Sequence, residues 1–394
     1  MEQAHFTTHQ LPGMEFNGGA NLTRAETGVV ARIKSMEVRS ARRQQGAGNL
    51  VDTLPLFSNY EIKLDKADHS NLVSIYDAIP RFQTATKTVR DMDKMTNQLE
   101  GTLNGEPFKV IMKAVSLELP VKVKGKLTGK TEWVGVYPGC REECVEEALR
   151  KFSTQPGKFL PAECAVRFTL YELKKELSSL GHSYSYSELR QALVILNESN
   201  LTIQTRTADG DSIDIKSTYL PTLFLRSSNK QSKNFIESKD MADEDRSTAT
   251  QCVAVLHPLI SRSIERGDYR LYHYNTSMRL TNSLAKILNR ELSMCWRNAS
   301  PKHAYTFSMI GFLTNTSRGL SARIPEDFRA MNIALKQLVD EGVLTEFSAK
   351  PVKKPKGKGA MDYVYSVLPT SKFVTMIIDG HRSEKARSEA ALSA

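Results

Sequence analysis

The sequence lacks long apolar runs and contains little cysteine. No stretch of the 394 residues approaches the 18 consecutive apolar residues that a transmembrane helix needs. The first fifteen residues contain acids and no apolar core, so we expect no secretory signal. Five cysteines are too few, and odd in number, for a disulfide framework. Together these absences predict a protein of the reducing cytoplasm.

The motifs of common enzyme classes are also missing. The sequence has no nucleophile elbow, no zinc-protease helix motif and no paired histidines of a DNA-nicking enzyme. Cys140 and Cys144 are spaced for one helix face, but no second Cys/His pair completes four zinc ligands. Residues 125–131 have three rather than four residues between their glycines, and a strand-like run follows. A hairpin turn is therefore favoured over a phosphate-binding loop. We expect no catalysis, no cofactor and no metal.

Basic residues outnumber acidic ones, 54 to 44, which gives a net charge of +10. This excess is compatible with a polyanionic partner such as nucleic acid. Residues 1–60 have little periodicity and predict a disordered basic arm, or else a soluble tail that contacts nothing. The arm contains one apolar island, Leu54, Leu56 and Phe57, around Pro55. The island either docks into a partner or begins the folded part.

Residues 61–250 predict a first domain that starts with a β-rich segment. Apolar residues at three-to-four spacing alternate with strand-like runs after it, and Ser185 with Glu188 fits a capping box. The expected elements are strands within 107–137, a helix at 142–152, a strand at 165–168, helices at 170–180 and 186–200, and a hairpin at 201–225. The polar run 227–250 is expected to be a linker.

Residues 251–378 predict a second domain in which the same layout recurs. The expected elements are a strand at 253–256, helices at 280–296, 308–315 and 325–341, and strands at 343–349 and 362–368 around a basic loop. Residues 379–394 are polar and are expected to be a tail. Two helices followed by a hairpin are typical of a winged helix, so the predicted fold is α+β with two tandem winged-helix domains.

The order of these elements resembles that of TrfA-like plasmid replication initiators, which have two tandem winged-helix domains. The resemblance rests on three stretches: CVEEALRKF followed by AVRFTLYELKKELSSLGHSYSYSELRQAL, the run from LTNSLAKILNRELSMCW through ARIPEDFRAMNIALKQLVDEGVL, and TLPLF. It implies a bacterial, plasmid-associated protein that binds repeats in a double-stranded origin and opens adjacent AT-rich DNA. It also implies recruitment of the host replicative helicase, dimer formation and copy-number control, without ATP hydrolysis.

In that family a Gln-Leu-x-Leu-Phe peptide at the corresponding place binds the replicative sliding clamp. Leu54, Leu56 and Phe57 match this peptide, whereas Thr53 replaces the glutamine and Pro55 occupies the free position. The resemblance therefore implies the clamp as a partner of the island, with one departure from the family pattern.

A winged helix places its second core helix in the major groove and its hairpin near the DNA backbone. In the second domain, the outward face of helix 325–341 is expected to present Arg329, Ile333, Lys336 and Gln337, with Arg323 just before it. The following loop contains five lysines and no acid, which favours a DNA-contacting wing: Lys350, Lys353, Lys354, Lys356 and Lys358. The alternative is an ordinary solvated surface.

In the first domain the corresponding helix is expected to present Tyr186, Arg190 and Gln191 outward. Acidic residues in this helix and in its hairpin turn oppose phosphate binding, so this domain is expected to bind DNA weakly or to form a dimer interface. A winged-helix transcriptional repressor would use the same groove contacts. Two unlike domains and an arm with an apolar island favour the initiator.

Overall fold

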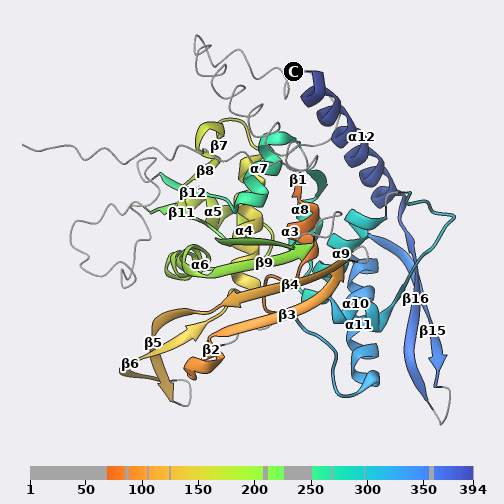
Figure 1. The fold of residues 1–394 in the computed structure, drawn as a ribbon, viewed down its shortest axis with the longest axis horizontal. Helices are drawn as coiled ribbons and strands as arrows, with labels where there is room; N and C mark the ends of the chain where they lie inside the picture. The colour runs from red at the N-terminus through yellow and green to blue at the C-terminus, as the bar shows by residue number, and fades with distance from the viewer. Residues whose placement is uncertain are drawn as a thin grey trace, which may run out of the picture. The chain divides into compact units, whose positions relative to one another are not determined.

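The computed structural model describes residues 69–84, 88–103, 106–123, 126–206, 212–225, 251–267, 269–296, 298–354 and 359–393. All of them belong to one compact unit, Ile62–Ala394 (Figure 1). The arm 1–60 with Leu54, Leu56 and Phe57, the segment 227–250, Lys356 and Lys358 lie outside the described residues. Among the described helices, none is long and apolar enough to cross a membrane.

The described helices and strands build two large hydrophobic cores, which we call the first and second modules, and one smaller cluster of Val115, Leu117, Val134, Val136 and Ile195. Buried side chains of the first core run from Val73 to Met278, and those of the second run from Leu280 to Ile377. Residues 252–278, expected in the second domain, thus contribute their buried side chains to the first core. The change from one core to the other falls at residues 279–280.

The first module is arranged around α4 (Cys140–Ser153), whose apolar residues Val145, Leu149 and Phe152 are all buried. The elements before α4 are β1 (His69–Leu72), α3 (Ser74–Ala78), β2 (Thr88–Val89), η2 (Met92–Lys94), β3 (Thr96–Leu103), β4 (Glu106–Lys113), β5 (Val115–Val123) and β6 (Lys126–Val136). Those after it are β7 (Phe159–Leu160), η3 (Pro161–Glu163), β8 (Ala165–Phe168), α5 (Leu170–Ser179), α6 (Tyr186–Glu198), β9 (Asn200–Arg206), β10 (Ser212–Thr218), β11 (Thr222–Phe224), β12 (Cys252–Val255), α7 (Pro258–Arg266), β13 (Arg270–His273) and α8 (Tyr274–Arg279).

Capping residues determine where α5 and α6 begin. The Ser185 side chain accepts a hydrogen bond from the Glu188 backbone N–H, and Glu188 accepts one from the Ser185 backbone N–H, as the sequence predicts. Thr169 and Glu172 form the same reciprocal pair at the start of α5. These caps satisfy amide groups that an isolated helix end would leave unpaired.

Four sheets belong to the first module, with strand orders β1-β13, β10-β9-β4-β3, β11-β12-β8-β7 and β2-β6-β5. The single strand expected at 212–225 is divided, because β10 pairs with β9 whereas β11 pairs with β12. Residues 126–131, in the glycine–lysine segment weighed above, lie in β6, which pairs with β5.

The second module contains α9 (Ser283–Cys295), β14 (Tyr305–Ser308), α10 (Met309–Thr314), α11 (Ile324–Asp340), β15 (Leu344–Lys353) and β16 (Ala360–Pro369). Its three strands pair in the order β14-β16-β15. The helix, helix and hairpin expected here are therefore present. The strand β15 is longer than expected, and it places Lys350 and Lys353 in the hairpin strand rather than in a loop.

The end of the chain differs from the sequence prediction. Helix α12 (Ser371–Ser393) replaces the polar tail expected from residue 379. Its first turns carry Phe373, Met376 and Ile377 into the second core. Its later turns contact β13 of the first module, and these polar contacts have no apolar periodicity that would reveal them in the sequence.

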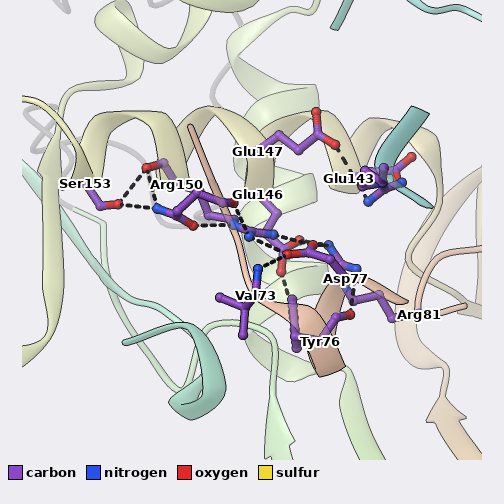
Figure 2. Close-up of polar contacts among 11 residues, drawn as sticks. Val73, Tyr76, Asp77, Arg81, Glu143, Glu146, Glu147, Arg150 and Ser153 are labelled. Carbon is purple, nitrogen blue, oxygen red and sulfur yellow. Dashed lines mark hydrogen bonds and ion pairs between the residues drawn. The ribbon is translucent and has the colours of Figure 1, made fainter. Parts of the chain in front are cut away.

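A buried network of charged residues links α3 to α4 (Figure 2). Asp77 lies 2.8 Å from Arg81 and 2.7 Å from Arg150, and Arg81 also lies 3.0 Å from Glu146. Burial alone would raise the pKa of Asp77, but the two guanidinium groups hold that pKa well below its usual range. The Tyr76 hydroxyl donates to Glu146 and completes the contacts of that carboxylate.

A second set of buried charges joins α4 to α9 and therefore joins the two modules. Arg290 pairs with Glu143 and lies 3.7 Å from Glu147, and the Lys286 Nζ lies 3.3 Å from the Cys144 Sγ. Burial would raise the pKa of Glu143, but Arg290 and Lys286 lower it below its ordinary value. The positively charged side chains of α9 thus face the carboxylates of α4.

We predict that Arg290→Met destabilises the protein by about 3–5 kcal/mol, because it leaves Glu143 and Glu147 buried without their cation. Urea unfolding of the whole chain measures the effect. The control is Arg90→Ala, which removes a pair with Glu132 at the surface and should change the midpoint little. A midpoint for Arg290→Met equal to that of the control would contradict the prediction.

Candidate nucleic-acid interface

Helix α11 has one buried and one exposed face. Pro325 occupies its first turn, where the missing N–H costs no hydrogen bond. The buried face consists of Met331, Ala334, Leu335 and Leu338. On the opposite face, Arg329, Ile333 and Lys336 are exposed, as the sequence predicts. Ile333 is 61% exposed, which is unusual for an isoleucine in a helix that packs on a core.

Gln337 does not belong to this exposed face. It is half-buried, its side-chain oxygen accepts from the Asn282 backbone N–H at 3.0 Å, and its amide donates to the Thr281 hydroxyl at 2.9 Å. The prediction of an outward Gln337 is therefore wrong. This residue instead holds α11 against the start of α9.

The turn before α11 is ordered by a carboxylate that the sequence analysis did not single out. Asp327 is buried, accepts from the Ser321 backbone N–H at 3.1 Å and pairs with Arg318 at 2.6 Å. This turn presents Arg323, whose side chain is 80% exposed and lies 3.8 Å from Glu326. Arg323 therefore lies at the start of α11 with a partner too exposed to hold it firmly.

The hairpin of β15 and β16 is tied to α11 through aromatic residues of β16. The rings of Phe328 and Tyr363 lie 4.2 Å apart between centroids, and the Tyr365 hydroxyl donates to Asn332 at 3.0 Å. Because α11 residues make both contacts, helix and hairpin are held in one arrangement.

Exposed lysines follow this hairpin outward. Lys350, Lys353 and Lys354 are all exposed. Within the described part of the chain, neither these lysines nor Arg329 and Lys336 on α11 have an acidic partner. The second module thus presents uncompensated positive charge on a helix and on the hairpin attached to it.

Helix α6 of the first module has no comparable face. Val194 and Ile195 on α6 pack against Val115, Leu117, Val134 and Val136 of strands β5 and β6. Arg190 is only 4% exposed, so the prediction that it points outward is wrong. Tyr186 and Gln191 are half-buried, and the Lys174 ammonium lies 4.4 Å from the Tyr186 ring centroid.

The sequence does contain a signal for this burial. Residues Ala192, Leu193, Val194, Ile195 and Leu196 are consecutive and apolar, so they cover every side of α6. Such a run indicates a helix that is covered on more than one side in this part of its length. The sheet of β5 and β6 supplies the cover, which the periodicity of α6 alone does not identify.

Among the described residues, no group of His, Cys, Asp and Glu side chains is arranged to hold a metal ion. Cys140 and Cys144 have separate surroundings. The Cys140 Sγ lies 3.3 Å from the Ser283 hydroxyl, and Cys144 lies beside Lys286. Burial raises the pKa of the Cys144 thiol to about 11, and Lys286 opposes this effect.

We predict that Gln337→Ala and Lys336→Ala, neighbours on α11, have opposite consequences. Gln337→Ala should lower the free energy of unfolding by about 1 kcal/mol, because it removes two hydrogen bonds to the start of α9. Lys336→Ala should leave that free energy nearly unchanged, because its side chain is exposed. Chemical denaturation of both variants measures the difference, and equal losses would show that Gln337 does not hold α9.

No family model matches the sequence, and no curated protein matches it. The fold is similar to a crystal structure of domains 2 and 3 of RctB, with a TM-score of 0.43, 11% identity, and coverage of 78% of this chain and 99% of that one. A selenomethionine form of the same domains gives a TM-score of 0.43, 10% identity, and coverage of 75% and 96%. The Pi initiator protein in complex with iteron DNA gives 0.39, 11% identity, and coverage of 59% and 91%.

Proposed function

We propose that this chain is a DNA-binding plasmid replication initiator that recognises repeats in double-stranded origin DNA through its second module. In this proposal both modules are winged helices, α11 enters the major groove, and the β15–β16 hairpin contacts the backbone. The chain performs no catalysis of its own. Opening of AT-rich DNA, recruitment of the clamp or helicase, and a homodimer are further parts of the proposal.

The observation that carries the proposal is the exposed face of α11 beside a lysine-bearing hairpin. A guanidinium such as that of Arg329 can donate two hydrogen bonds to a guanine edge, and Ile333 can contact a thymine methyl. Lys336 and the hairpin lysines are suited to phosphates, which they attract without reading sequence. A helix and a hairpin fixed to each other can supply both kinds of contact at once.

The covered face of α6 gives the two modules different tasks. Because Val194 and Ile195 pack on β5 and β6 and Arg190 is buried, we assign one reading helix to each chain. Repeated sites then bind several chains, one for each repeat. In each chain, the first module positions the second module. It also provides a surface for protein contacts, such as a dimer interface.

We predict that replacing Lys350, Lys353 and Lys354 together with alanine weakens binding to all duplex DNA alike. If each lysine neutralises one phosphate, the slope of log K against log salt should fall by about 0.9 per lysine, or about 2.7 for three. The control is Lys175→Ala on α5, an exposed lysine outside the proposed interface. Fluorescence anisotropy across a salt series measures the slope. An unchanged slope would remove the hairpin from the interface.

We predict that Arg329→Ala costs about 1–3 kcal/mol on the cognate repeat, and less on random DNA, if this side chain reads a base. Arg382→Ala, an exposed arginine on α12, is the matched control. Equal losses on both DNAs would mean that Arg329 contacts only phosphate.

The initiator function is tested with a plasmid whose replication depends on this chain. Arg329→Ala should reduce replication in parallel with its affinity for the repeats. A repressor would bind its operator with the same face, so loss of repression with replication unchanged would favour the repressor instead.

A further inference from the structure

Helix α12 belongs to both modules. Its first turns bury Phe373, Met376 and Ile377 in the second core. Its later turns, within residues 379–387, contact β13 and the residues Gly267 and Tyr269 just before it, all in the first module. One continuous helix therefore runs from the second core, on which α11 packs, to β13 of the first module.

The close approach of α12 to β13 requires a glycine. A Cβ atom added at Gly380 would lie 3.0 Å from the Leu271 carbonyl oxygen, which is backbone and cannot swing away. One helical turn later, Glu384 pairs with Arg270 at 3.1 Å. The helix thus packs closely on the backbone of β13 at Gly380 and is also held there by the ion pair of Glu384 with Arg270.

Arg387 makes the last of these contacts. Its Nε donates to the Gly267 carbonyl at 3.1 Å, another guanidinium nitrogen donates to the Tyr269 carbonyl, and the guanidinium lies 4.2 Å from the Tyr269 ring centroid. Two carbonyl acceptors and an aromatic face hold the planar fork of an arginine better than a point charge could.

Arg270 connects these contacts to α9. Its guanidinium donates to the Ser293 and Met294 carbonyls at 3.0 and 2.9 Å, while Glu384 accepts from it. These carbonyls lie in the last turn of α9, where backbone acceptors lack helical partners and a cation is favourable. Three elements from both modules therefore share one arginine.

We propose that residues 379–387 form a strap that holds the second module on the first and thereby fixes the orientation of α11. The two cores meet in sequence at Arg279 and Leu280, a short connection that could turn if the strap were released. The strap acts together with the buried pair of Arg290 and Glu143, which lies on the α4 side of α9. The inference about module coupling stands on these contacts alone, and only its consequence for DNA rests on the proposed function.

A hydrogen bond between the two modules, at a place distant from α12 in sequence, can report whether the strap affects their contact elsewhere. The Thr102 backbone N–H on β3 of the first module donates to the Asn315 side chain, just after α10 of the second module, at 3.1 Å. Neither residue touches α12 in any contact given above. Exchange of the Thr102 amide with solvent therefore reports loss of the contact between β3 and the residue after α10, and does not report loosening confined to β13.

The experiment compares three forms of the whole chain by site-resolved hydrogen exchange: wild type, Arg387→Ala, and Arg382→Ala. The control arginine lies on the same helix and is exposed, with its side chain 3.7 Å from Asp379. We expect Arg387→Ala to raise exchange at Thr102 about fivefold and the control to leave it unchanged. A chain that ends after Ile378 keeps Phe373, Met376 and Ile377, and we expect about a tenfold rise for it.

Faster exchange confined to β13, with Thr102 unchanged in both the arginine variant and the shortened chain, would overturn the strap. DNA binding provides a separate readout. With the strap released, affinity for a single repeat should stay within about twofold of wild type, because α11 and its hairpin are intact. A wild-type chain that binds no repeat would defeat the proposed function and leave the exchange result standing.

Discussion

The pairing of Arg290 with Glu143 and Glu147 is the constraint on which the arrangement of the two modules depends. All three side chains are buried, and a buried charge without its partner is far costlier than a missing surface pair. A shift of α9 along α4 that kept the helices packed would leave charge of both signs unpaired in the interior. The modules therefore have one strongly preferred way to meet rather than a range of nearly equal ones. The contacts of Asp77 with Arg81 and Arg150 extend this constraint to α3.

Local signals in the sequence predicted the helices well. The capping residues Ser185 and Glu188 and the left-handed Gly342, with φ of 71°, act within a few residues of the helix ends that they determine. Strand pairing was harder, because β10 pairs with the preceding strand β9, whereas β11 leaves that hairpin and pairs with β12, which lies beyond residue 250. The helical end of the chain was missed for a related reason. Its contacts use Glu384 and Arg387 on partners more than 100 residues away, and polar residues of this kind look like a tail.

The candidate interface was predictable where burial follows helical periodicity. Arg329, Ile333 and Lys336 lie opposite the buried stripe of α11, so spacing alone places them. Gln337 lies at the border of that stripe, and its hydrogen bonds go to residues 55 and 56 positions earlier. The prediction for Arg190 was wrong because this side chain is buried, on a helix whose residues Val194 and Ile195 pack against β5 and β6. The partners of Gln337 and the strands that pack on α6 are both distant in sequence, so the local pattern of each helix does not identify them.

Precise reading of DNA requires that the reading side chains be held by groups that cannot shift. In the second module, Phe328 and Asn332 hold the hairpin, Asp327 orders the turn before α11, and Gln337 fixes the helix to α9. Each of these residues lies on α11 itself but faces away from its exposed side. In the proposed function, the same helix thus divides its residues between DNA recognition and support. Since α9 is held by the first module through Arg290, the support of the exposed face of α11 continues into the first module. In the proposed function, the first module thus positions the second, and α6 itself reads no DNA.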